Sequence, residues 1–283
     1  MAKNEWQDDP SELLRATATF QLSDIDPGST PGFEGDKDDG EELLAQCAEE
    51  LAEWQEKLFA ESRYGGNRAL LLVLQAMDTA GKGGIVRHVA GAFDPKGVAV
   101  ASFGVPTPEE LEHDFLWRIR KRLPAPGIVG VFDRSHYEDV LVHRVRELTP
   151  LDEIEQRYGT INDFEREVVA GGTQIVKVML HISPDEQKER LAERLDRDDK
   201  HWKYKPSDVD ERMLWPAYQE AYQLAIERTT TDHAPWFVVP ADSKWYARIA
   251  VQRLLLDALE RMDPQWPDAD FDVEAEKKRL AAS

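Results

Sequence analysis

The residues whose types and spacing best suit chemistry lie in one short stretch, AMDTAGKGG at positions 76–84. Phosphate-binding loops follow the pattern G-x-x-x-x-G-K-[ST] between a buried strand and a helix. Gly81 and Lys82 fit this pattern, whereas Ala76 replaces the first glycine and Gly83 replaces the serine or threonine. The stretch therefore predicts a phosphate loop that lacks the hydroxyl group usually bound to magnesium.

The backbone and the lysine of this loop suit an anion. Gly81 permits a sharp turn, and the amides that begin the next helix, together with the helix dipole, favour negative charge. Lys82 would add a mobile positive charge for a terminal phosphoryl group. An ordinary turn between a strand and a helix is the alternative, but the order of strand, loop, Gly-Lys and helix favours the phosphate loop.

Two aspartates offer oxygen atoms to a metal ion. Magnesium prefers oxygen ligands, often one or two carboxylates together with phosphates and waters. Asp78 lies within the loop, and Asp133 ends the apolar run IVGVFD at 128–133. Ligands bind beyond the carboxyl ends of parallel strands, so both side chains should reach the same edge of a sheet. We therefore expect them to bind Mg²⁺; capping a helix, a turn or a strand end is the alternative for each.

Basic side chains occur at two further places. Arg134 follows the second aspartate directly and could pair with it or bind phosphate. The segment 186–205 holds 7 basic and 6 acidic residues, with Arg190, Arg194 and Arg197 at helical spacing along one face. This segment is either an exposed helix with salt bridges or a lid that closes over a phosphate chain and excludes water.

A set of histidines could be mistaken for metal ligands. His136 and His143 lie near Glu138, but their spacing matches no zinc pattern and no cysteine pair accompanies them. We expect them to be ordinary core or surface side chains.

The elements that position these residues alternate between strands and helices. Short runs rich in Val, Ile and Leu are typical of a parallel sheet covered on both faces, and the alternation predicts βαβ units. The predicted strands are Ala69–Gln75, Val98–Phe103, Ile128–Phe132, Ile175–Ile182 and Pro235–Val239. The predicted helices span 83–93, 108–122, 136–147, 152–170, 184–196, 208–228 and 243–262, preceded by an extended arm at 23–40 and a helix over Glu41–Ser62.

Length and composition indicate a globular protein. With 283 residues the chain can bury a large core, and we expect one α/β domain with additions. The longest apolar run, around 69–74, is too short to span a membrane, and MAKNEWQDDP lacks the apolar segment of an export signal. The single cysteine, Cys47, excludes an internal disulfide and suits a reducing compartment. We expect a cytoplasmic protein with no membrane partner.

The formal net charge of −20 is concentrated at the two ends of the chain. Residues 1–56 hold 16 acidic and 3 basic side chains, and residues 257–283 hold 8 and 4, which leaves the central part at only −3. A basic surface for nucleic acid is missing, so we expect no nucleic-acid partner. A local basic cleft in the central part agrees with this distribution.

Several motifs together resemble the polyphosphate kinase 2 family. They are MDTAGKGG, FDRSHYEDV and DDKHWKYKPSDVDER, with DIDPGSTPGFEGDK before them and APWFVVPADSKWYAR after them, and they span roughly residues 20–256 in the order of the family. The resemblance implies phosphoryl transfer between inorganic polyphosphate and nucleotides. It also implies an α/β fold: a three-layer α/β/α P-loop kinase fold similar to thymidylate kinase, with a parallel five-stranded sheet, a helical lid, dependence on Mg²⁺ and assembly into homodimers or homotetramers.

The resemblance also implies roles for individual residues, and it favours the lid interpretation of the basic helix. The expected catalytic residues are Asp78, Lys82, Asp133, Arg134, Arg190 and Arg194, of which Asp78 and Asp133 would bind the metal. The expected phosphate- and polyphosphate-binding residues are Thr79, Ala80, Gly81, Lys82, Gly83, Gly84, Arg87 and Lys203. We expect an acidic N-terminal arm and helix over 1–60 and a phosphotransferase domain over 61–283, with the lid at about 184–215.

The acceptor nucleotide stays open between two classes. Asp133 is more usual in members of the family that act on nucleoside diphosphates, where other members carry Asn, and Gly83 occupies a position where some relatives have Asp. We expect ADP/ATP and GDP/GTP as partners, with AMP as a further candidate. The alternatives for function are an ATP-dependent nucleoside monophosphate kinase and a non-catalytic phosphate or nucleotide sensor; paired metal-binding carboxylates speak against the sensor.

Overall fold

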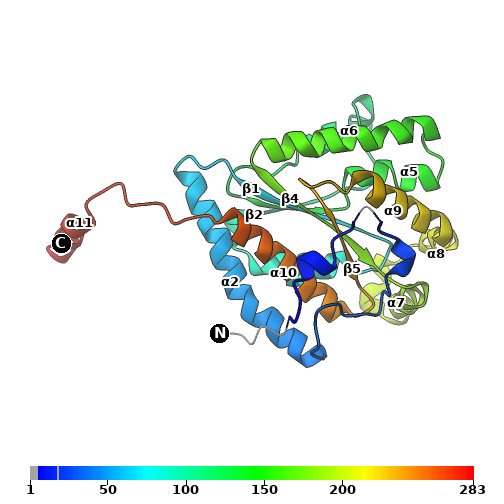
Figure 1. The fold of residues 1–283 in the computed structure, drawn as a ribbon, viewed down its shortest axis with the longest axis horizontal. Coiled ribbons are helices and arrows are strands. Elements are labelled where there is room, and N and C mark those ends of the chain that lie inside the picture. The colour runs from blue at the N-terminus through cyan, green and yellow to red at the C-terminus, as the bar shows by residue number, and fades with distance from the viewer. Residues whose placement is uncertain (1–5, 18) are drawn as a thin grey trace.

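Five parallel strands form a single sheet in the order β2-β3-β1-β4-β5 (Figure 1). The structure is a computed structural model and describes residues 6–17 and 19–283. The strands are β1 (Ala69–Ala76), β2 (Val98–Ser102), β3 (Val129–Asp133), β4 (Thr173–His181) and β5 (Trp236–Pro240). All four strand pairs are parallel, which confirms the predicted sheet.

Helices cover both faces of the sheet. On one face lie α2 (Lys37–Arg63), α3 (Lys82–His88) and α10 (Lys244–Met262), and on the other lie α6 (Leu151–Ala170) and α9 (Trp215–Thr229) (Figure 1). The remaining helices are α1 (Pro10–Leu13), α4 (Trp117–Arg120), α5 (Val142–Val145), α7 (Pro184–Asp196), α8 (Ser207–Met213) and α11 (Val273–Ala281). This arrangement is the predicted three-layer α/β/α fold.

The central strand places the predicted chemistry at one edge of the sheet. Every residue of β1 is buried, because the strand has neighbours on both sides and helices on both faces. Its register pairs Leu74 with Asp133 on β3. The loop that follows β1 and the aspartate that ends β3 therefore leave the sheet at the same edge, as expected for parallel strands.

The N-terminal segment covers the outer edge of β5. The amide of Ala16 donates to the carbonyl of Trp236 at 2.8 Å, and the amide of Val238 donates to the carbonyl of Leu14 at 2.8 Å. An uncovered edge would leave these backbone groups free to pair with another chain. The arm then continues over α10, where the Tyr246 hydroxyl donates to the carbonyl of Pro31 at 2.8 Å.

Three predicted helices are wrong as continuous elements. The stretch 108–122 contains only a 3₁₀ turn, Glu110–Glu112, and the short α4; the Asp114 carboxylate accepts from the Leu116 amide and begins a new turn there. The stretch 136–147 divides into a 3₁₀ turn, His136–Asp139, and α5, because the side chains of the first turn are drawn into the core.

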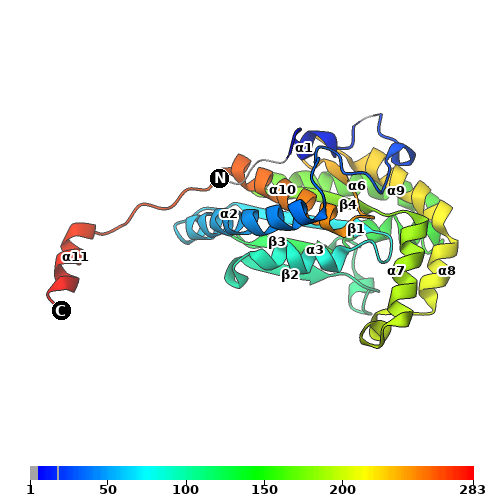
Figure 2. The same ribbon diagram turned by 90° about the horizontal axis from the view of Figure 1, so that it is seen from below.

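The third of these, 208–228, divides into α8 and α9 at Leu214. Pro216 lies in the first turn of α9 and has no N–H to continue the hydrogen bonds of α8, so a new helix begins there. The result is a bent pair of helices. In Figure 2, α7 and α8 lie side by side at one end of the molecule.

The helices predicted over 152–170, 184–196 and 243–262 agree with α6, α7 and α10, whereas the one predicted over 83–93 is only α3, followed by a 3₁₀ turn at Ala90–Ala92. The helix predicted over Glu41–Ser62 is α2, which begins earlier because Asp36 and Asp39 form a reciprocal capping box. The polar tail after Met262 leads through an extended linker to α11, which lies apart from the body (Figures 1 and 2). No helix among residues 6–17 and 19–283 has the length and apolar character needed to cross a membrane.

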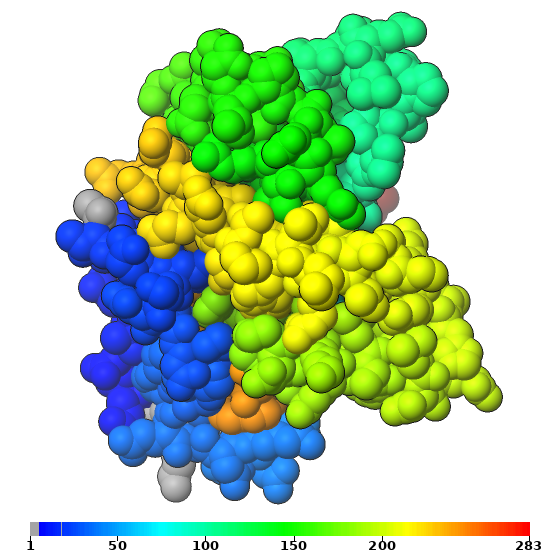
Figure 3. Space-filling view, turned by 90° about the vertical axis from the view of Figure 1, so that its right-hand side faces the viewer, coloured from blue at the N-terminus to red at the C-terminus, as the bar shows by residue number. Residues whose placement is uncertain are grey.

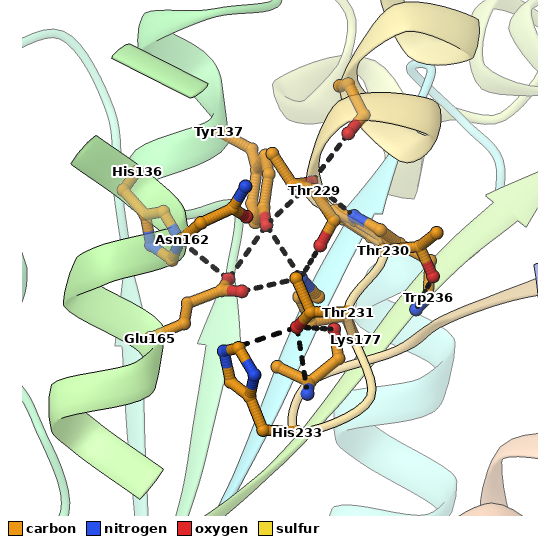
Figure 4. Close-up of polar contacts among 12 residues, drawn as sticks. His136, Tyr137, Asn162, Glu165, Lys177, Thr229, Thr230, Thr231, His233 and Trp236 are labelled. Carbon is orange, nitrogen blue, oxygen red and sulfur yellow. Dashed lines mark hydrogen bonds and ion pairs between the residues drawn. The ribbon is translucent and has the colours of Figure 1, made fainter. Parts of the chain in front are cut away.

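A buried polar network joins the sheet to the α6–α9 layer (Figure 4). The Lys177 ammonium on β4 donates to Glu165 Oε2 at 2.6 Å, to the Tyr137 hydroxyl at 2.9 Å and to the Thr229 carbonyl at 2.7 Å. The same carboxylate lies 3.2 Å from His136 Nε2 through its other oxygen. The side chains of Lys177 and Glu165 are 0% exposed, so this ion pair belongs to the core.

Candidate active site

The phosphate loop turns sharply between β1 and α3. Thr79 and Gly81 have φ angles of 66° and 117°, in the left-handed region, and the positive angle at the threonine is unusual for a residue with a side chain. Such backbone conformations persist where the surrounding structure holds them, and they gather at functional sites. The Lys82 ammonium donates to the carbonyl of Ala76 at 2.9 Å, so the lysine folds back over its own loop.

The helix α7 holds the outer side of this loop. Gln187 Nε2 donates to the carbonyl of Asp78 at 3.1 Å, and Arg190 Nη1 donates to the carbonyl of Thr79 at 3.0 Å. Arg190 is 5% exposed, and its Nη2 also donates to the carbonyl of Ala241 at 2.7 Å. The guanidinium group of Arg190, predicted to be catalytic, therefore binds backbone carbonyls in this structure.

The two predicted metal-binding carboxylates, Asp78 and Asp133, line the same cavity. Arg134 lies between acidic groups: its Nη2 is 3.2 Å from Asp78 Oδ1, and its Nη1 is 3.5 Å from Glu138 Oε2. Its φ angle of 64° places it in the left-handed region as well. This backbone conformation ends the extended strand, and the Arg134 side chain contacts Asp78 in the phosphate loop.

A basic cavity of about 500 Å³ opens above the loop. Ten lysine and arginine side chains line it against three carboxylates, although the whole chain carries a net charge of −20. The basic residues are Lys82, Arg87, Arg134, Arg190, Arg194, Arg197, Lys200, Lys203, Lys244 and Arg248. A concave surface with this excess of positive charge attracts and concentrates anions.

A second cavity of about 520 Å³, here called the mixed cavity, adjoins the first. Apolar side chains such as Val105, Leu148 and Tyr222 line it together with polar groups such as Glu138. In Figure 3 the surface is hollowed between the teal segment and the yellow-green region of α7 and α8. Four residues line both cavities, which places these residues where the cavities meet: Asp78, Arg134, Arg194 and Lys203.

The structure brings all of the sequence-predicted site residues together around the basic cavity. They are Asp78, Thr79, Ala80, Gly81, Lys82, Gly83, Gly84, Arg87, Asp133, Arg134, Arg190, Arg194 and Lys203. Their chemical roles stay predictions, since the geometry shows only where they lie. The predicted lid segment contributes to both cavities through Arg194 on α7 and Lys203.

Sequence reasoning missed several residues of the site. Lys244 and Arg248 on α10 line the basic cavity, and their spacing within SKWYAR, i and i+4, was the available signal. Glu138 was dismissed together with the histidines, yet it lies beside Arg134. Gln187 carried no signal, because an isolated glutamine on a charged helix is ordinary.

Both histidines lie beside carboxylates, and His143 also lines the mixed cavity. His136 is buried against Glu165, and His143 Nε2 lies 3.5 Å from Asp139 Oδ1. Within the part of the chain that the structure describes, no group of three or more His, Cys, Asp or Glu side chains is arranged to bind a metal. Asp78 and Asp133 offer hard oxygen atoms beside the loop, and such a donor set fits Mg²⁺ when phosphate and water complete it.

Burial and neighbouring charges shift several pKa values at the site. Burial lowers the pKa of the Lys82 ammonium below its usual range, and the nearby Asp78 carboxylate opposes part of this effect. Burial raises the pKa of Glu138, and Arg134 opposes this shift. The positive charge of the loop lysine is therefore sensitive to its surroundings, and a bound anion would favour its protonated form.

Comparisons with known proteins identify relatives along nearly the whole chain. The family model described as Polyphosphate kinase 2 (PPK2) matches residues 34–267. The AMP/ADP-polyphosphate phosphotransferase of Meiothermus ruber is 47% identical over 251 residues, covering 89% of this chain and 92% of that protein. The ADP-polyphosphate phosphotransferase of Rhodopseudomonas palustris is 39% identical over 254 residues, covering 86% of each chain.

A solved structure gives the same result for the fold. The crystal structure of polyphosphate kinase 2 from Arthrobacter aurescens TC1 is 57% identical and superposes with a TM-score of 0.98, covering 100% of both chains. These relatives favour the polyphosphate-dependent reaction over the alternative of an ATP-dependent nucleoside monophosphate kinase.

Proposed function

The chain belongs to the polyphosphate kinase 2 family, and from that premise we propose that it transfers phosphoryl groups between inorganic polyphosphate and nucleotides. One observation carries the proposal beyond family membership. The basic cavity and the mixed cavity meet at Asp78, Arg134, Arg194 and Lys203, so a phosphate chain in one and a nucleotide in the other would bring their ends together.

The two cavities differ in the way that the two substrates differ. Polyphosphate is a chain of anionic groups with no apolar part, and it suits the basic cavity with its ten cationic side chains. A nucleotide has a base and sugar as well as phosphates, and it suits the mixed cavity, where Val105, Leu148 and Tyr222 provide apolar surface. We therefore assign polyphosphate to the first cavity and the nucleotide to the second.

The proposed reaction is a direct in-line transfer. A terminal phosphate oxygen of the nucleotide attacks the end phosphorus of polyphosphate and forms a new P–O bond, while the bond from that phosphorus to its bridging oxygen breaks. The shortened polyphosphate leaves with the bridging oxygen and its electron pair. No general base is required, because the attacking oxygen is already ionised.

The protein contributes position and positive charge. Lys82 and the loop amides would hold the phosphates of the donor, and Arg134 and Arg194, which line both cavities, would neutralise charge during transfer. Arg190 would act mainly by holding the loop, since it donates to the carbonyls of Thr79 and Ala241. This differs from the catalytic role that the family resemblance implies for it.

Asp78 and Asp133 would hold Mg²⁺ at the meeting point of the substrates. Bound there, the ion would neutralise phosphate charge and align donor and acceptor oxygens. Two carboxylates on one cavity fit a cation that takes its other ligands from phosphates and water. The ion pair between Asp78 and Arg134 at 3.2 Å would then give way in part to the metal.

We further propose ADP and GDP as the preferred acceptors, with AMP as a weaker one. Asp133 supports diphosphates by the family resemblance, and the named relatives include proteins that use ADP and one that uses both AMP and ADP. The segment of about 184–215 would form the lid, cytoplasmic placement would give access to nucleotides, and a homodimer or homotetramer would be the assembly. Sedimentation analysis of the purified protein tests the assembly.

A matrix of acceptors tests the proposed function directly. AMP, ADP, GMP and GDP are each supplied with polyphosphate, with and without Mg²⁺ and with no ATP added. We expect ATP and GTP to form from the diphosphates only in the presence of the metal. A requirement for ATP as the donor would instead identify a nucleoside monophosphate kinase, and binding without any transfer would identify a sensor.

A further inference from the structure

Gln187 is an unexpected contact between α7 and the phosphate loop. It is a neutral side chain in a highly charged helix, yet it is only 2% exposed. Its Nε2 donates to the carbonyl of Asp78 at 3.1 Å, and its Oε1 accepts from Arg212 Nη1 on α8 at 3.1 Å. One amide therefore connects the loop to the second helix of the predicted lid.

The direction of these hydrogen bonds matters for an anion. Gln187 and Arg190, one turn apart on α7, donate to the carbonyls of the consecutive residues Asp78 and Thr79. Each carbonyl oxygen carries partial negative charge and would repel a phosphate that it faced. Holding both carbonyls against α7 leaves the amide donors of the loop available for the anion, and it stabilises the positive φ angle of 66° at Thr79.

The helix that carries these contacts is itself fixed at its first turn. The Asp242 carboxylate accepts from the Ser183 amide at 2.8 Å, just before α7 begins. The carbonyl of Asp242 accepts from Arg190 Nη2 at 2.8 Å, and its amide donates to the carbonyl of Pro27 in the N-terminal arm at 3.1 Å. Gln187 thus extends from a firmly held helix, and a change on α8 can reach the loop through it.

From this geometry we propose that Gln187 is a positioning residue, which orients the Asp78 peptide of the phosphate loop and couples it to α8 through Arg212. The proposal rests on the proposed function, because the loop is taken to hold the phosphoryl donor. Gln187 lines the mixed cavity assigned to the nucleotide but not the basic cavity assigned to polyphosphate. Its effect should therefore fall on the rate of transfer more than on the binding of polyphosphate.

The test compares Gln187→Met with a matched control, Gln223→Met. Gln223 also makes two hydrogen bonds to residues far away in the sequence, accepting from the Leu22 amide at 2.7 Å and donating to the Phe20 carbonyl at 3.0 Å, but it lines neither cavity. We expect Gln187→Met to lower kcat by about 10- to 100-fold with KM for polyphosphate nearly unchanged, because small misplacements of reacting groups cost rate. Gln223→Met should leave both constants near those of the wild type.

Two further measurements separate positioning from a loss of stability. Arg212→Met removes the hydrogen bond to Gln187 and one to the carbonyl of Pro184 but leaves Gln187 bound to the loop, so it should lower kcat less. The double variant should be no slower than Gln187→Met alone. Amide hydrogen exchange of the peptide covering residues 77–85 should increase in Gln187→Met and not in Gln223→Met. Equal kcat values for the wild type and Gln187→Met, or strictly multiplicative effects of the two changes, would overturn the proposal.

The hydrogen-exchange measurement does not depend on activity. If the wild type failed to use polyphosphate but Gln187→Met still loosened the loop, the proposed function would be wrong and the positioning role would stand. If the wild type were active and the loop peptide exchanged equally in both proteins, the positioning role would be wrong and the proposed function would stand.

Discussion

The basic cavity and the buried network between the sheet and the α6–α9 layer both contain lysine side chains, but the two regions differ in whether every such side chain is paired with a carboxylate. In the network, the Lys177 ammonium donates its three hydrogen bonds to Glu165, Tyr137 and Thr229. In the cavity, Lys82 and Arg248 have no carboxylate within 4.0 Å among residues 6–17 and 19–283. Six of the ten basic residues of the cavity, Arg134 among them, also have a carboxylate partner. The contrast therefore applies to charges such as Lys82 and Arg248, which remain available to a ligand.

The same contrast appears within a single helix. On α10, Arg248 lines the basic cavity, whereas Arg253, just over one turn later, pairs with Asp257 and Glu260. Both are arginines on one element, so residue type alone does not distinguish them. What differs is the neighbourhood: Arg253 meets two carboxylates of α10 itself, whereas among the described residues no carboxylate lies within 4.0 Å of Arg248. The following predictions test this division between binding charge and structural charge.

The largest effect should come from removing the loop lysine. We expect Lys82→Ala to lower kcat/KM by about 10³-fold or more, because it removes a positive charge placed at the transferring phosphoryl group. Asp133→Ala should also abolish transfer, because it removes one of the two carboxylates proposed to bind Mg²⁺. Stopped assays with polyphosphate and ADP measure the rate, and circular dichroism should show an unchanged fold. Lys188→Ala, on α7 outside both cavities, is the control. Near-normal rates would refute the site.

The opposite result should follow from breaking the buried network. Lys177→Met leaves Glu165 as a buried charge without its ammonium partner, so we expect a loss of about 3–5 kcal/mol in the free energy of unfolding. The folded fraction should keep its transfer rate, because the network lines neither cavity. Urea denaturation measures the stability. A second change, Glu165→Leu, should recover part of the lost stability. A Lys177→Met enzyme that keeps its stability but loses its transfer rate would contradict a purely structural role for the network.

A smaller effect should appear in the pH dependence. Burial lowers the pKa of Lys82, so the ammonium should lose its proton at a pH below the ordinary lysine value of about 10.4. As pH rises through this lowered pKa, kcat/KM for polyphosphate should fall, since this ratio reports the free enzyme. Lys82→Arg should remove that alkaline decline, because a guanidinium stays charged. An identical decline in both proteins would assign the titration to another group.

The smallest effect should separate the two arginines of α10. Arg248→Ala should raise KM for polyphosphate about two- to fivefold, the size expected for one partly exposed charge, with little change in stability. Arg253→Ala should do the reverse, lowering stability by breaking its contacts with Asp257 and Glu260 while leaving KM unchanged. The effect on KM should weaken as salt increases. A rise in KM in both variants would contradict the division.

Much of the fold followed from local pattern. The five strands were predicted within about two residues of their observed ends, because parallel strands show short apolar runs between turn residues. The edge strand β2 has such a run too, although its residues are partly or fully exposed rather than buried as predicted. The helices at 108–122, 136–147 and 208–228 were predicted wrongly as continuous. In each, helical spacing persists across a break that an aspartate cap, a buried turn or Pro216 imposes, and hydrophobic period alone does not detect such breaks.

The sequence by itself determined the chemistry of one sheet edge. A phosphate loop after one buried strand and an aspartate at the end of another must meet there, because parallel strands present their carboxyl ends together. Only the tertiary structure decided which charges stay free, which ones pair, and that Gln187 holds the Asp78 carbonyl. Gln187 and Asp78 lie 109 residues apart, so no local pattern predicts their contact. Pairs such as Arg253 with Asp257 do have the local i,i+4 spacing, but that spacing alone does not show which charged residues the fold leaves free for a ligand.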